Sequence, residues 1–307
     1  MTPQMLNIWL NENKFVALQL QKKQSIMARE LSTTHLNMYK AGGELSVLFE
    51  RITDDPELSF ELRPKDEVMV YYNKKKILTI KKGLKIEPLS AKYYEPGLGP
   101  TVDISDSKNW KNTKVIDKYL KEAKLIAYKK DMKREFQLQQ NISLGNHDCE
   151  GRYLVVDMEW QFSQEKIAAN DRIKKTRIDL IVVDLKPNSR GENDIYLTEV
   201  KLGTDALEGN SGLQGHVNST HEIVCFKPAC EALKDDVTSI ITQKHELGIF
   251  LGKLPSLRLS NKPKMLFILG HRGSAERAQL EKAMSKLSIP PELDKPEVIY
   301  HDTLIKL

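Results

Sequence analysis

Apolar and polar positions along the chain divide it into a strand-rich beginning and a longer region in which strands and helices are mixed. Two runs of β-branched and aromatic residues flank Asn73–Lys76 within residues 67–89, a pattern typical of a β-hairpin. Asp54–Pro56 is a turn signal, and Tyr93–Pro100 is rich in proline and glycine, as linkers are. We therefore expect an N-terminal β-rich domain at residues 1–95, a linker at 96–111 and a second domain at 112–307.

The second region predicts an α/β (α+β) domain. Apolar residues recur at steps of three and four between about residues 112 and 141, so one side of a helix there is apolar. A turn at 203–212 leads into another helix, which we expect to reach about residue 233. The expected strands are 151–162, 176–185, 194–202, 262–271 and 297–305, with a last helix at 275–287.

Two of these apolar strands carry charged residues. Asp179 lies in one strand, and Glu199 and Lys201 share one side of the next, because side chains alternate along a strand. A hairpin would set Asp179 beside that pair, and burying such a cluster is costly unless the charges pair or bind a cation. Carboxylate oxygens are ligands of Mg²⁺ and Mn²⁺, which can polarise a phosphodiester. The alternative is a salt bridge at the end of a strand.

The spacing of Asp179 and the later Glu199-Val200-Lys201 resembles the PD-(D/E)XK nuclease superfamily, although Ile178 rather than proline precedes Asp179. The resemblance covers about residues 115–271, roughly half of the chain. It implies a restriction-endonuclease-like core, in which helices flank a central mixed sheet, and Mg²⁺- or Mn²⁺-dependent hydrolysis of DNA. It also implies that Asp179, Glu199 and the Val200 carbonyl hold the metal, while Lys201 positions or activates water.

The superfamily often adds a glutamate from the helix that precedes the first core strand. Glu135 is the best-placed match, and the alternative is an exposed helical residue. Glu159, in the first core strand, is a rival for the same role.

RecB-like members of the superfamily carry a glutamine after the Glu-x-Lys strand, with a tyrosine four residues on. Gln214 matches the glutamine, but Asn218 stands where the tyrosine would be. His216 and His221 are near in sequence and could make a related contact. The alternative for Gln214 is a helix cap or a surface residue.

Charge favours a nucleic-acid partner without proving one. The net charge is +5, and basic residues gather at residues 71–92 and 108–134. Lysines neutralise phosphates and aromatics stack on bases, so we expect DNA as the partner, with a homodimer as one open arrangement. The alternative is a solvated helix face and a lysine-rich hairpin. The basic trios in question are Lys74, Lys75 and Lys76, and Lys118, Lys121 and Lys124.

Cysteine usage and hydropathy bear on the compartment. Cys149, Cys225 and Cys230 form no CxxC pair and match no zinc spacing, so we expect a reducing, cytoplasmic setting. The chain has no long apolar run, so we expect no membrane span.

The function expected from the sequence is a metal-dependent DNA endonuclease of restriction, phage defence or repair. The alternatives are a catalytically inactive nucleic-acid-binding protein on a nuclease fold, and a structural α/β protein.

Overall fold

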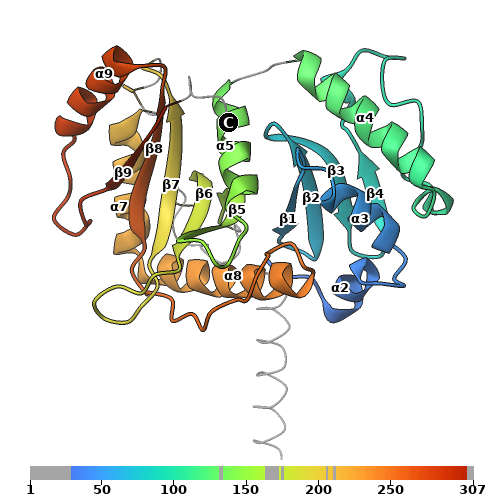
Figure 1. Ribbon diagram of the computed structural model, residues 1–307, viewed down its shortest axis with the longest axis horizontal. Helices are drawn as coiled ribbons and strands as arrows, with labels where there is room; N and C mark the ends of the chain where they lie inside the picture. Colours follow the sequence, from blue (N-terminus) through green and yellow to red (C-terminus); the bar gives the residue numbers. More distant parts are fainter. Residues whose placement is uncertain are drawn as a thin grey trace, which may run out of the picture.

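Two β-sheets with helices packed against them form the protein, as the computed structural model shows (Figure 1). The structure describes residues 29–130, 134–162, 173, 176–204, 207–209 and 212–302. The first sheet is antiparallel with the strand order β1-β2-β3-β4, and the second is mixed with the order β5-β6-β7-β8-β9. The expected mixed α/β class is therefore confirmed.

The first sheet belongs to an N-terminal lobe, residues 29–130. Its tightest connection is the expected hairpin, in which Asn73 and Lys74 both have left-handed backbone angles (φ 46° and 63°). Two such residues in a row are typical of the turns whose twist matches that of a hairpin. The elements of this lobe are α2 (Thr33–Tyr39), α3 (Ser46–Thr53), β1 (Ser59–Arg63), β2 (Glu67–Tyr72), β3 (Lys75–Lys81), β4 (Lys85–Pro88) and α4 (Thr113–Lys130).

The lobe differs from the expected strand-rich domain in its helices. Leu48 and Ile52, four residues apart in α3, are both fully buried, which is the spacing of a helix rather than of a strand. The helix expected at about 112–141 is two helices, and α4 packs against β3 instead of the second sheet. Tyr119 of α4 donates a hydrogen bond to the Ile77 carbonyl over 2.6 Å. Residues 1–28 of the expected domain lie outside the described residues.

The second sheet belongs to a C-terminal lobe, residues 134–302. Strands β6 and β7 form the expected hairpin, β5 pairs antiparallel with β6, and the last two strands run parallel to β7. Pro228 in the first turn of α8 and an extended Phe226 divide the single helix expected up to residue 233. The elements are α5 (Arg134–Gly145), β5 (Tyr153–Gln161), β6 (Arg177–Asp184), β7 (Ile195–Leu202), α7 (Leu213–Cys225), α8 (Lys227–Glu246), β8 (Lys264–His271), α9 (Ser274–Ser285) and β9 (Glu297–Asp302). Residues 303–305 of the last expected strand lie outside the described part.

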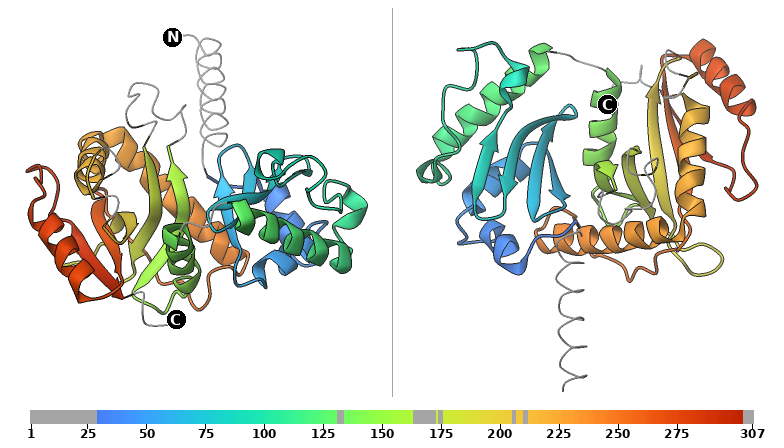
Figure 2. Two further views of the ribbon diagram at one scale, coloured as in Figure 1. Left: turned by 90° about the horizontal axis from the view of Figure 1, so that it is seen from above. Right: turned by 180° about the vertical axis from the view of Figure 1, so that it is seen from behind.

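Helices cover both faces of this sheet. Leu266 and Ile268 of β8 pack with Leu138 of α5 on one face, while Met265 and Phe267 pack with α7 and α9 on the other. Strand β8 is therefore buried on both sides, which explains its unbroken apolar sequence. In Figure 1 α5 stands between the two sheets, and α4 lies on the far side of the first sheet, as the rear view of Figure 2 also shows.

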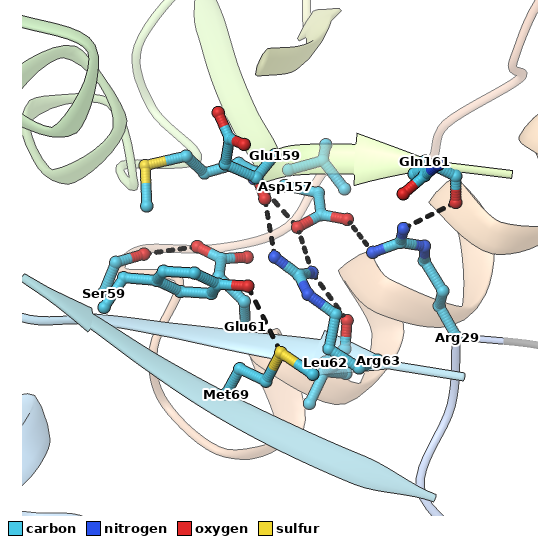
Figure 3. Close-up of polar contacts among 12 residues, drawn as sticks. Arg29, Ser59, Glu61, Leu62, Arg63, Met69, Asp157, Glu159 and Gln161 are labelled. Atoms are coloured by element: carbon cyan, nitrogen blue, oxygen red, sulfur yellow. Dashed lines mark hydrogen bonds and ion pairs between the residues drawn. The ribbon is translucent and has the colours of Figure 1, made fainter. Parts of the chain in front are cut away.

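Buried charges join the two lobes (Figure 3). Arg63 of β1 and Arg29 each donate to the Asp157 carboxylate of β5, both over 2.7 Å. Lys244 of α8 donates to Glu61 of β1 over 2.8 Å. All five side chains are at most 6% exposed, so each charge depends on its partners for the stabilisation that water would otherwise supply.

Candidate active site

Three neighbouring strands bring three carboxylates to the side of the second sheet that faces the N-terminal lobe's hairpin. Met158 pairs with Leu180 and Trp160 pairs with Ile178, so Glu159 stands opposite Asp179 in the register. Leu180 pairs with Thr198 in the antiparallel β6–β7 ladder, so the next pair along is Asp179 and Glu199. Glu159, Asp179 and Glu199 therefore occupy one row across β5, β6 and β7.

Asp179 is fixed by contacts to both of its carboxylate oxygens. Oδ1 accepts a hydrogen bond from Lys74 Nζ over 2.9 Å, and Oδ2 accepts one from the Val200 backbone N–H over 3.1 Å. Burial would raise the pKa of Asp179, but the charges of Lys74 and Lys201 and these hydrogen bonds outweigh it and hold the pKa below its ordinary value. Asp179 is therefore an ionised carboxylate in a buried setting.

Glu159 shares the Lys74 ammonium with Asp179. Lys74 Nζ lies 2.5 Å from Glu159 Oε1, and Arg177 lies 3.2 Å from the other oxygen. The backbone of Glu159 is left-handed, with φ 57°, a conformation that costs a non-glycine residue about 1 kcal/mol or more. In Figure 3 its carboxylate points away from the Arg63–Asp157 contact. The strained backbone of Glu159 therefore occurs at a residue whose carboxylate contacts Lys74 in the row.

Glu199 and Lys201 form a buried pair next to this group. Lys201 Nζ lies 2.8 Å from Glu199 Oε1, and His216 Nε2 of α7 lies 3.0 Å from the same oxygen. Burial and the nearby Asp179 charge raise the pKa of Glu199, although His216 and Lys201 oppose the rise. Burial would lower the pKa of Lys201, but Glu199, Glu135 and Asp179 raise it above its ordinary value. Lys201 is therefore an ammonium, able to donate hydrogen bonds but not to accept a proton.

Compared with known proteins, the chain matches no family model, no curated protein and no solved structure. No helix in the described ranges is both long enough and apolar enough to cross a membrane.

The structure places the remaining predicted site residues unevenly. Glu135, half-buried in the first turn of α5, is close enough for its charge to act on Lys201. Val200 is fully buried and its N–H bonds to Asp179, while a metal-binding role for its carbonyl stays a prediction. The described hydrogen bonds of Gln214 go to Asn218 and Ser288 instead of the row.

Gln214 instead links α7 to the segment after α9. Its amide group donates to the Ser288 carbonyl over 3.0 Å and accepts from the Ser288 N–H over 2.9 Å. Of the residues considered near it, His216 reaches Glu199, whereas His221 contacts Glu292 and Cys225. Gln214 therefore has a structural contact to the segment after α9, and its catalytic role stays a prediction.

Lys74 is the contact that sequence reasoning missed. The hairpin was predicted, and Lys74 was placed at its tip as a phosphate contact, but its ammonium lies between two carboxylates. Lys75 also turns inward, donating to the Ala127 carbonyl over 2.6 Å. Only the packing of one lobe on the other brings Lys74 to Asp179, and no local pattern encodes that packing.

The donor set is compatible with a hard divalent cation. Asp179 and Glu199 offer carboxylate oxygens, the ligands that Mg²⁺ and Mn²⁺ prefer. The Lys74 ammonium between Asp179 and Glu159 shows that these two carboxylates already bind a positive charge. Among the described residues, no cluster of three or more histidine, cysteine, aspartate or glutamate side chains is arranged as a ready metal cage. Metal would therefore need water or substrate oxygens as further ligands, which is usual for Mg²⁺.

Proposed function

We propose that this protein is a metal-dependent nuclease of the PD-(D/E)XK type that hydrolyses phosphodiester bonds in DNA. The observation that carries the proposal is the meeting of Asp179 with Glu199 and Lys201 on adjacent buried strands. The chain order of α5, three antiparallel strands, α7 and a parallel β8 supports a restriction-endonuclease-like core.

In this proposal, Asp179, Glu199 and the Val200 carbonyl would hold Mg²⁺ or Mn²⁺. The bound metal supplies a Lewis acid that polarises the phosphodiester and lowers the pKa of water. Lys201, as an ammonium, donates a hydrogen bond to the attacking water or to a phosphoryl oxygen. His216 would keep Glu199 in place through its contact to Oε1, and Glu135, whose charge acts on Lys201, would orient water.

The DNA would contact the side of the molecule where both lobes meet the row. Arg177, whose side chain is 63% exposed, and the exposed Arg134 lie at the starts of β6 and α5 and are suited to phosphate contacts. The N-terminal lobe would then help to position the duplex.

A homodimer would provide two centres for cutting both strands. The three free cysteines agree with a reducing cytoplasm.

The decisive experiment is incubation of purified protein with plasmid DNA and Mg²⁺ or Mn²⁺, against an EDTA control. We expect cleavage by the native protein, loss of cleavage in Asp179→Asn, and retained cleavage in Asp184→Asn. Asp184 is a matched control because it is a buried, ion-paired aspartate of the same strand, paired with Arg152 rather than with the row. Metal-independent cleavage, or full activity of Asp179→Asn, would refute the assignment.

A second candidate is a nucleic-acid-binding protein without activity. The observation that favours it is that ammonium groups already neutralise both Asp179 and Glu199. Binding of Mn²⁺ separates the two candidates, because only the nuclease requires metal at the row.

A further inference from the structure

Lys74 reaches the row from the other lobe and bonds to one of the two carboxylate oxygens of Asp179. Its position in the turn between β2 and β3 lies 105 residues before Asp179 in the chain. The ammonium sits 2.5 Å from Glu159 Oε1, 2.9 Å from Asp179 Oδ1 and 4.7 Å from the centre of the Phe136 ring of α5. The Lys74 side chain is 13% exposed, so water screens it poorly.

The two contacts of Asp179 differ in how easily they can be given up. Oδ2 accepts from the Val200 N–H, which lies in the backbone of β7 and cannot move away without breaking the strand. Oδ1 accepts from the Lys74 side chain, which lies on a turn and can move away. A cation bound to Oδ1 would be repelled by the Lys74 ammonium, which now lies 2.9 Å from that oxygen.

We infer that Lys74 competes with the divalent cation for Asp179, so that the β2–β3 hairpin of the N-terminal lobe determines how readily the centre takes up metal. This inference rests on the proposed function and adds a positioning residue to it. Metal can bind Asp179 when the Lys74 ammonium leaves Oδ1. Uptake of metal therefore depends on a residue from each lobe, Asp179 and Lys74. Lys74 needs no contact with substrate for this role.

Mn²⁺ titration of the full-length protein without DNA tests the inference, followed by calorimetry or by the electron paramagnetic resonance signal of free Mn²⁺. We expect Lys74→Met to bind Mn²⁺ about tenfold or more tightly than the native protein, because an unscreened like charge is removed. Lys74→Asn should behave in the same way, and asparagine tolerates the left-handed backbone at this turn. Lys74→Arg should keep the native affinity.

Arg177→Met is the matched control. It removes a cation that pairs with the same Glu159, at 3.2 Å, but Arg177 has no described contact with Asp179. A gain confined to Lys74→Met and Lys74→Asn supports competition at Oδ1. An equal gain in Arg177→Met, or unchanged or weaker binding in the Lys74 variants, overturns the inference.

The outcomes also separate this inference from the proposed function. Native protein that binds Mn²⁺ and cleaves DNA, with Lys74 variants of equal affinity, retains the nuclease and removes the competition. Mn²⁺ binding by the Lys74 variants alone, without cleavage, supports the competition and refutes the nuclease. Failure of every variant to bind Mn²⁺ refutes both.

Discussion

Arg63 of β1 donates a 2.7 Å hydrogen bond to Asp157 of β5, although the two residues are 94 positions apart in the chain. The same carboxylate accepts from Arg29, so two guanidinium groups share one acid in the interior. Burial would raise the pKa of Asp157, but both arginines outweigh it and keep the group ionised. This carboxylate therefore joins the lobes whose relative position puts Lys74 beside Asp179.

Replacing Asp157 should destabilise the protein strongly. Asp157→Asn leaves Arg29 and Arg63 as buried charges without a compensating carboxylate, and we expect the free energy of unfolding to fall by about 3–5 kcal/mol. Urea denaturation measures this. Asp117→Asn, which breaks an exposed pair with Arg51, should cost far less, because water already stabilises exposed charges. Equal losses in the two variants would show that the interlobe contact is not a major source of stability.

Glu61 should make stability depend on pH. Burial raises its pKa from 4.5 to about 7, despite the nearby Lys244 and Arg63. Between these values the folded protein retains a proton that the unfolded chain has lost, so stability falls as pH rises from about 4.5 to 7 and levels off above. Glu61→Gln should flatten this part of the curve of unfolding free energy against pH. An unchanged slope in that variant would assign the dependence to other groups.

Removal of Asp179 should weaken the fold slightly. Asp179 and Glu199 are neighbouring carboxylates, so deleting one would relieve repulsion between them. The lowered pKa of Asp179 shows, however, that Lys74 and the Val200 N–H stabilise its ionised form. We expect Asp179→Ala to lose about 1–3 kcal/mol of unfolding free energy at neutral pH. Thermal or urea unfolding without metal checks the sign, and a gain in stability would mean that repulsion within the row dominates.

Lys201 should act on turnover more than on DNA binding. If its ammonium donates to water or phosphate in the transition state, Lys201→Ala lowers turnover by about two to four orders of magnitude. Single-turnover cleavage and a separate DNA-binding titration distinguish these effects. Normal turnover with weak binding would make Lys201 a phosphate contact.

The α4 lysines should contribute little to DNA binding. Lys124 pairs with Asp55 at 2.7 Å and Glu57 at 2.8 Å, and α4 lies on the outer side of the first sheet (Figure 2). Replacing Lys118, Lys121 and Lys124 together by alanine should leave the slope of log affinity against log salt unchanged. Arg177→Ala, beside the row, should flatten it by about 1. A flatter slope in the α4 variant would restore the phosphate contacts predicted from sequence.

Strands with strong apolar patterns could be predicted, and so could the neighbours that a hairpin joins. The antiparallel pairing of β6 with β7 and the meeting of Asp179 with Glu199 followed from alternation and a short connection. The division between α4 and α5 did not, because the apolar stripe continues across two helices that pack on different sheets.

The missed site residues depend on contacts between distant parts of the chain. Lys74 and Asp179 meet only because the two lobes pack on each other. From sequence alone, a lysine at a turn is expected to be exposed to solvent. Gln214 was assigned by resemblance, and the segment that it binds, at Ser288, lies 74 residues further along the chain. Glu159 was recognised as a rival, yet its left-handed backbone has no signal in its residue type.

The row of Glu159, Asp179 and Glu199 has a consequence for insertions and deletions. Neighbouring members are separated by the distance between strands, about 4.8 Å, so the connecting segments can change length without altering that spacing. A single residue deleted within β7 before Glu199 would instead move the glutamate to the opposite face of the sheet and bring Val200 into its place. Natural length variation should therefore occur in the segment from Leu185 to Asn193, and be excluded from the strands on either side of it.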